Sequence, residues 1–367
     1  MEEITIMWCN LRSASARRLG GLVSALLLAA AVWDPLAVAG EPARSVLVLT
    51  STNTASANDV VVFKLETAGT PALSLLDVLR TGGTGGASSN AGAVQFRDDL
   101  GAVANFGSNT VTQLARHDDS IVVEGTIKLL PHCVKPVSVA LTGERLFVVG
   151  ANCAESLGWP SGASIGEVVA LSDSSAAQIA VGESWAAVTF TSGSVLQLPL
   201  ASDGALSGAS DALTLPSDAD NTPLGAAFWG NILGFTPAHS SDSFAVVNPE
   251  GNVFPIPGPT PPYPTNAPCW VAKGPGSIWY TGNSPDAAIS IFFTDGAGGV
   301  LYKSVALPGS PTDITVSRDR KWLAVIYTAG GAGHIAVFAI DHQGDLSLVA
   351  TSSPIGVSAF NGVAFSE

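Results

Sequence analysis

Short apolar runs broken by polar turns recur through most of the chain. Residues 311–350 show the pattern in full, with the runs PTDITVS, WLAVIYT, HIAVFAI and LSLVA separated by RDRK, AGGAG and DHQGD. Residues 268–306 repeat it with PCWVAKG, SIWYTG, AISIFF and VLYKSVA. Brief apolar stretches bounded by Gly, Asp, Asn and Pro are typical of β-strands rather than helices. The pattern therefore predicts a repeating unit of four strands.

The repeat can be followed from the residue that opens each first strand. These residues are Ala91, Pro136, Ala176, Pro223, Pro268, Pro311 and Phe360, spaced 40 to 49 residues apart. A four-stranded unit at this period indicates an all-β fold, the β-propeller, with one blade per repeat.

The two ends of the chain supply one further blade between them. The last repeat holds only FNGVAF, at 360–365, whereas the N-terminal part carries SVLVLTS, NDVVVFKLE and LSLLDVL. Pairing the two completes a seventh blade and removes the open sheet edges of a linear stack. One irregularity is expected: no room remains between Leu171 and Ala176 for an outer strand in the third repeat, so that blade is expected to have three strands.

Three segments carry a resemblance to a known family. They are VANFGSNTV at 103–111, GERLFVVGAN at 143–152 and RKWLAVIYTAGG at 320–331. These resemble the repeats of the lactonase or YVTN-type seven-bladed propellers, the family of 6-phosphogluconolactonase and the 3-carboxymuconate cyclases. The resemblance covers nearly all the chain after residue 40. It implies the propeller fold, and it implies a lactonase-like hydrolase if the protein is catalytic.

The N-terminus resembles a targeting segment. Arginines precede an apolar stretch at 19–33, and the small residues Ala-Val-Ala follow at 37–39. A basic start, a short apolar region and a small-x-small site form the pattern of a secretory signal peptide. We expect a signal at 1–39, a single propeller domain at 40–367 and a periplasmic or secreted protein; an uncleaved anchor is the alternative.

Export would permit a disulfide. Cys133 and Cys153 flank a predicted hairpin with strands at 137–141 and 146–149, and the midpoint of the two cysteines, residue 143, is the turn itself. Residues placed symmetrically about such a turn face each other across an antiparallel pair. We therefore predict a Cys133–Cys153 disulfide, which leaves Cys269 as a small buried residue.

The net charge of the protein excludes two classes of binding partner. The formal net charge is −14, from 16 Lys and Arg against 30 Asp and Glu. Nucleic acids and anionic membranes need clustered cations, so neither is an expected partner. No run after residue 39 is long and apolar enough to span a bilayer. We expect a monomer that binds a small molecule or an envelope protein.

In a propeller, the loops that enter the first strands and the turns between second and third strands share one face. This face is the default binding site. The candidate ligand-binding residues there are Asn90, Gln178, Asn221, Asn266, Trp270 and Asn361. Trp159 joins them from an enlarged loop predicted at 152–165. Three arginines, Arg97, Arg318 and Arg320, fall in first-to-second-strand turns on the opposite face and are left out.

Lactone hydrolysis needs a base for water and a donor or cation at the carbonyl oxygen. His132 or His334 could be the base and Lys135 the electrophile, while Asp313 could orient or replace the base. The competing interpretation is that these residues satisfy backbone groups where strands begin. No cofactor and no metal is expected. Two functions stay open: an exported lactonase-like enzyme, or a non-catalytic propeller that binds a protein, glycan or small ligand at the cell envelope.

Overall fold

The computed structural model describes residues 45–67, 69–217, 219–239, 244–256, 267–354, 356–357 and 360–367. The chain divides into two units, residues 1–42 and 43–367, and the described residues all belong to the second. The predicted signal segment at 1–39 and the candidate residue Asn266 lie outside the described residues.

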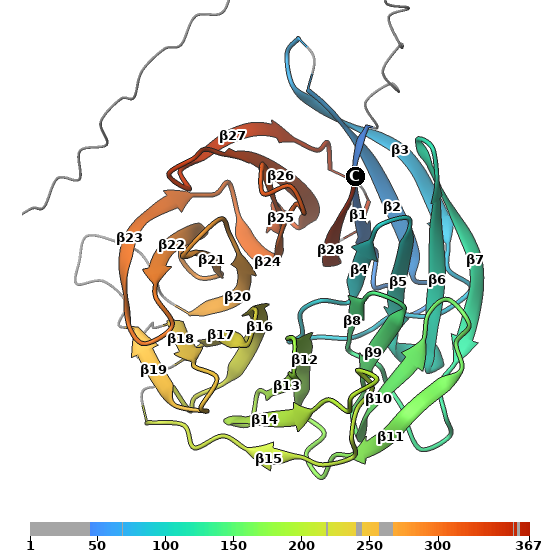
Figure 1. The fold of residues 1–367 in the computed structure, drawn as a ribbon. Coiled ribbons are helices and arrows are strands. Elements are labelled where there is room, and N and C mark those ends of the chain that lie inside the picture. Colours follow the sequence, from blue (N-terminus) through green and yellow to red (C-terminus); the bar gives the residue numbers. More distant parts are fainter. Residues whose placement is uncertain are drawn as a thin grey trace, which may run out of the picture. The chain divides into compact units, whose positions relative to one another are not determined.

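The described residues form seven four-stranded antiparallel sheets arranged in a ring (Figure 1). The inner strands are β4 (Val94–Arg97), β8 (Ser138–Thr142), β12 (Ala176–Val181), β16 (Pro223–Trp229), β20 (Pro268–Lys273), β24 (Ser310–Val316) and β28 (Asn361–Ser366). The second strands are β1 (Val46–Ser51), β5 (Leu100–Asn105), β9 (Arg145–Val149), β13 (Trp185–Phe190), β17 (Ile232–Pro237), β21 (Ile278–Asn283) and β25 (Trp322–Ala329).

The third strands are β2 (Asp59–Glu66), β6 (Thr110–His117), β10 (Cys153–Gly158), β14 (Ser194–Pro199), β18 (Phe244–Val247), β22 (Ala288–Thr294) and β26 (Ala332–Ile340). The outer strands are β3 (Ala72–Arg80), β7 (Ser120–Lys128), β11 (Ser164–Ala170), β15 (Asp211–Ala212), β19 (Val253–Ile256), β23 (Gly299–Ala306) and β27 (Leu346–Thr351). A 3-10 turn, η1 (Phe106–Ser108), joins β5 to β6. The blades are numbered 1 to 7 from the β4 blade to the β28 blade.

The predicted closure of the ring is confirmed. Strand β28 pairs antiparallel with β1, with Val363 opposite Thr50. The Thr50 hydroxyl donates to the carbonyl of Gly362 at 2.6 Å. From blade 1, the buried Arg116 donates to the carbonyl of Ser366 at 2.6 Å, so a neighbouring blade also holds the joined ends together.

The core lies between neighbouring blades. In β1, Val48 packs against blade 6 while Leu47 and Leu49 pack against blade 1, and all three are fully buried. Side chains alternate between the two faces of a strand, so the short apolar runs are those of strands covered on both sides. Burying each such side chain contributes about 1.5–3 kcal/mol.

The expectation of a three-stranded blade is wrong. Residues 153–158, assigned in the sequence to an enlarged loop, form strand β10 between β9 and β11. The outer strand of that blade is therefore β11, which ends at Ala170, and all seven described sheets have four strands. The shortest outer strand is β15, with two residues.

Candidate functional site

The central channel has two ends. We call the end with the loops into the inner strands the upper end, and the end with the turns after the inner strands the lower end. At the upper end, the Trp270 indole of blade 5 donates to the backbone carbonyl of Asn90, which precedes the inner strand of blade 1, at 3.3 Å. The Ala91 N–H donates to the carbonyl of Ala177, in blade 3, at 3.2 Å. Segment 90–91 therefore crosses the top of the channel.

Asp313 of blade 6 fastens the same segment. Its Oδ2 accepts the N–H of Gly92 at 3.0 Å and its Oδ1 accepts the N–H of Ile314 at 2.8 Å. Burial raises the pKa of the carboxyl to about 7, against the opposing effect of N–H groups from Gly92, Ile314 and Val363. The Asp313 carboxylate thus links three inner strands at the closed end.

Gly92 is needed for this crossing. Its φ is +66°, a left-handed conformation that L side chains rarely adopt. A Cβ there would lie 3.0 Å from both Gln178 Nε2 and Ser138 Oγ. Together, Trp270 and segment 90–92 form a plug, a term used below for these four residues. Asn90 and Trp270 are only 4% and 8% exposed, so the plug is tightly packed.

Below the plug, the channel holds a cavity of about 220 Å³ whose lining includes Gly92, Gln178, Asp313, Lys273 and Arg320. At the lower end lies a cavity of about 680 Å³, which we call the mouth. Its lining includes Gln95, Phe96, Arg97, Leu141, Phe228, Thr315, Arg318, Arg320 and Glu367. Gln95, Leu141, Thr315 and Arg320 line both cavities, so the channel leads into the mouth.

Three arginines and three acidic residues line the mouth, and one of the arginines, Arg320, lies beside a buried lysine of the channel. Arg320 donates to the carbonyl of Lys273, and the Lys273 ammonium is itself buried. That ammonium donates to the carbonyls of Gly274 and Ile278 at 2.8 and 3.3 Å. Burial, with the nearby charge of Arg320, lowers the pKa of Lys273 to about 8. Arg97, Arg318 and Arg320, which the sequence placed on the face opposite the candidate site, thus lie at the open end of the channel.

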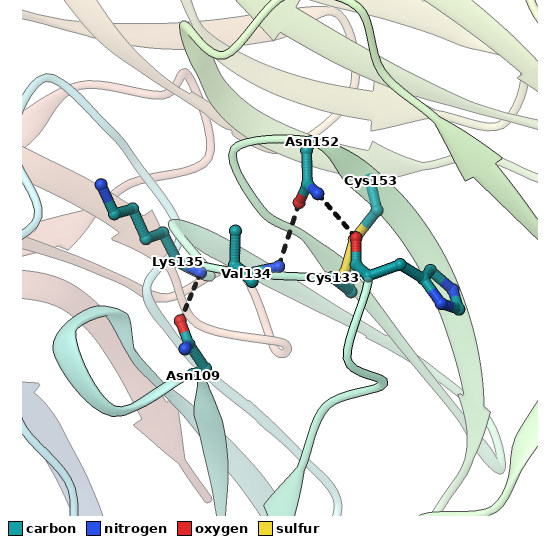
Figure 2. Close-up of a disulfide and its surroundings, with 7 residues drawn as sticks. Asn109, Cys133, Val134, Lys135, Asn152 and Cys153 are labelled. Atoms are coloured by element: carbon teal, nitrogen blue, oxygen red, sulfur yellow. Dashed lines mark hydrogen bonds between the residues drawn. A yellow bond between two sulfur atoms is a disulfide. The ribbon is translucent and has the colours of Figure 1, made fainter.

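His132 and Lys135 lie together in the loop between β7 and β8, at the upper end and exposed to solvent. Asn152 anchors this loop, accepting the N–H of Val134 at 3.0 Å and donating to the carbonyl of His132 at 2.7 Å (Figure 2). Asn109 accepts the N–H of Lys135 at 2.8 Å. Neither predicted residue lines the channel cavity that Asp313 lines, so the proposed catalytic set is not brought together.

The predicted disulfide is present between Cys133 and Cys153, whose Cα atoms are 5.2 Å apart (Figure 2). Cys153 opens β10, whereas Cys133 precedes β8 in the loop. Backbone pairing continues past the strand ends, because the Ala151 N–H donates to the carbonyl of Val134 at 2.9 Å. This extension of the hairpin brings the two sulfurs together.

Trp159 is not on the predicted face. It lies in the turn between β10 and β11, at the lower end, and it is only 4% exposed. It packs with Leu157 and Leu146 in the core between blades 1 and 2. The prediction that Trp159 belongs to an upper loop failed because residues 153–158 form a strand, which carries the next turn to the opposite end.

The remaining candidates are spread around the upper end. His334 of β26 stacks on Tyr327 with ring centroids 5.1 Å apart. The exposed Asn221 donates to the carbonyl of His239 at 2.9 Å, and the backbone carbonyl of the buried Asn361 accepts the Ser51 hydroxyl. Gln178 Oε1 accepts the N–H of Ala226 at 2.6 Å. Each of the four has a described contact that joins neighbouring strands or loops.

Two features of the site were not predicted from the sequence. One is the plug, because nothing in the sequence pairs Asn90 with Trp270. The other is the mouth, although the recurrence of arginine in inner-strand turns was visible. Among the described residues, no group of three or more His, Cys, Asp or Glu side chains is placed to hold a metal ion. The described segments also contain no helix long and apolar enough to cross a membrane.

Comparison with solved structures places the fold. A gluconolactonase from the periplasm of Pseudomonas aeruginosa matches with a TM-score of 0.60 and 14% identity over 88% of this chain and 99% of that one. The chain shares the β-propeller fold of that protein. A functionally unknown protein from Desulfotomaculum acetoxidans matches with a TM-score of 0.66 and 15% identity, covering 88% and 99% of the two chains.

Virginiamycin B lyase from Staphylococcus aureus matches more loosely, with a TM-score of 0.53 and 12% identity over 76% of this chain and 94% of that one. No family model and no curated protein matches the sequence. The resemblance predicted from the repeat motifs is thus confirmed for the fold. At these identities it carries the fold alone, because one propeller architecture serves many unrelated activities.

Proposed function

We propose that the protein is an exported, lactonase-like propeller that binds a small molecule in its channel, admitted through the mouth at the lower end. The observation that carries this proposal is the asymmetry of the channel. The plug seals the upper end, while a cavity of about 680 Å³ at the lower end continues into the channel. Concave sites with a few convergent polar groups are the usual places for small ligands.

The proposed location rests on the N-terminal segment and the disulfide. Residues 1–39 have the pattern of a signal peptide, which would leave the propeller at 40–367 as the exported domain. The Cys133–Cys153 bond fits an oxidising compartment, since cytosolic thiols are kept reduced. Expression with the native N-terminus, followed by mass spectrometry of the exported protein, tests this: a chain that starts near residue 40 supports export.

Hydrolysis of a small lactone is the second candidate. It is favoured by the likeness to a gluconolactonase in fold. Two places compete for the chemistry: the upper loop with His132 and Lys135, and the lower mouth with Arg97 and Arg320. The alternative to both is a propeller that binds without turnover.

One panel of small lactones and their hydroxy acids separates these possibilities, with binding followed by calorimetry and opening of the lactone by acid release. Thr315→Trp should abolish binding, because residue 315 lines both the channel and the mouth. If the lactone is hydrolysed at the upper loop, His132→Ala and Lys135→Ala reduce turnover and Thr315→Trp does not. Binding that Thr315→Trp leaves unchanged would overturn the proposed site.

A further inference from the structure

We infer that the mouth binds a small monocarboxylate with an apolar body, held by Arg97 and Arg320. This deepens the proposed function and rests on it, because it assumes that the ligand enters at the lower end. It assigns a chemical class to the ligand and a role to two arginines.

The first step is that two guanidinium groups at the mouth have no carboxylate partner among the described residues. Arg97 is exposed, and its side chain makes no hydrogen bond or ion pair within the described part of the chain. Arg320 donates to the backbone carbonyl of Lys273, which neutralises no charge. Arg320 and Lys273 also repel each other. An anion bound at Arg320 would relieve the repulsion between Arg320 and Lys273.

The second step is that the fold brings the two arginines to one place. Arg97 ends β4 in blade 1, and Arg320 follows β24 in blade 6. The residues beside them are joined, because Arg318 forms an ion pair with Asp98. This pair ties the two turns together across the end of blade 7. Both arginines line the mouth, and a guanidinium group matches the planar, two-oxygen face of a carboxylate.

The third step limits the ligand's charge. Arg97, Arg318 and Arg320 line the mouth with Asp98, Asp99 and Glu367, three formal charges of each sign. Asp98 is taken by Arg318, and Glu367 Oε2 accepts the backbone N–H of Arg318 at 3.0 Å. With Asp98 paired to Arg318, the side chains of Arg97 and Arg320 and two carboxylates remain at the mouth. The two arginines can match one negative charge of a ligand, whereas the second charge of a phosphate monoester would be opposed by the carboxylates.

The fourth step concerns the rest of the ligand. Phe96, Leu141, Phe228 and Phe365 line the same cavity from blades 1, 2, 4 and 7. Phe228 is held edge-on against Trp185, with ring centroids 4.7 Å apart. Apolar side chains beside the arginines of a mainly polar cavity suit a compact ring that carries one carboxylate. The acid formed when a lactone opens belongs to the same charge class.

The experiment measures binding of benzoate, cyclohexanecarboxylate, mandelate and gluconate by calorimetry, alongside benzamide and phenyl phosphate. We expect at least one of the ring acids to bind at least tenfold more tightly than benzamide and than phenyl phosphate. The double variant Arg97→Gln, Arg320→Gln should weaken binding of that acid at least tenfold, since the hydrogen bonds between the guanidinium groups and the carboxylate are lost. Arg80→Gln, which removes an exposed arginine of the outer strand β3, is the matched control and should change nothing.

The outcomes separate the two proposals. If the acid and its amide bind equally but Thr315→Trp abolishes both, the carboxylate inference is wrong and the channel site stands. If the acid binds but Thr315→Trp has no effect, the channel site fails. Tighter binding of phenyl phosphate, equal loss in Arg80→Gln, or no binding by any of the four acids also overturns the inference. Matching circular dichroism and melting curves verify that each variant folds.

Discussion

The carboxyl of Asp313 makes a measurable prediction about stability against pH. Its side chain is 5% exposed, and burial raises its pKa from 3.8 to about 7. A pKa rise of this size means that the protonated carboxyl favours the folded state by about 4 kcal/mol more than the ionised carboxylate does. Because the folded state binds the proton more tightly, this contribution to stability is complete below about pH 4 and is lost as the pH rises through 7.

Asp313→Asn is neutral at every pH and keeps the shape of the side chain. The free energy of unfolding of the variant minus that of the parent should therefore rise by about 4 kcal/mol between pH 4 and pH 8. Every other carboxylate is common to both proteins, so its titration cancels in the difference. Urea unfolding followed by tryptophan fluorescence, at five or six pH values across this range, provides the measurement.

Asp341→Asn is the control of opposite sign. N–H groups of Asp345 and Gln343 bind the Asp341 carboxylate at 2.8 Å, and the pKa of Asp341 is lowered, with the N–H of Asp345 the largest cause. Its stabilising contribution is present above its unfolded pKa and is lost as the pH falls, so its difference curve should slope the other way. A flat curve for Asp313→Asn, or one that falls with pH, would show that the three N–H groups lower the pKa of Asp313 at least as much as burial raises it, which would contradict the prediction.

Two further changes test the upper end of the ring. Trp270→Ala removes the largest side chain of the plug; it should cost about 3–5 kcal/mol of unfolding free energy and admit small solutes from the upper end, measured by denaturant unfolding and by quenching of the remaining tryptophans with acrylamide. Replacing Cys133 and Cys153 together by Ser should cost about 3 kcal/mol, because the bond closes a loop of sequence separation 20, and addition of reductant should lower the melting temperature of the parent but not of the variant.

The sequence alone predicted the seven blades, although it missed strand β10 in one of them. The apolar pattern of a strand can be read from its own residues. Successive side chains contact the two neighbouring blades in turn, so both sets are apolar, as Val48 and Leu49 are in β1. The closure also followed from the sequence, since the single strand at 361–366 and the three-stranded N-terminal part fit together by count. The Cys133–Cys153 bond was readable because it spans one hairpin, whose symmetry the turn at 143 sets.

The tertiary structure alone decided which end of the channel is open. The closing contacts join Asn90 to Trp270 and Gly92 to Asp313, residues 180 and 221 positions apart. No local periodicity encodes such a pairing; it exists only because the ring places blades 1, 5 and 6 around one axis. Trp159 was misplaced for a related reason: one unrecognised strand moves every later turn of its blade to the other end. The physical difference is that strand formation depends on neighbours in sequence, whereas the plug and the mouth depend on neighbours across the channel.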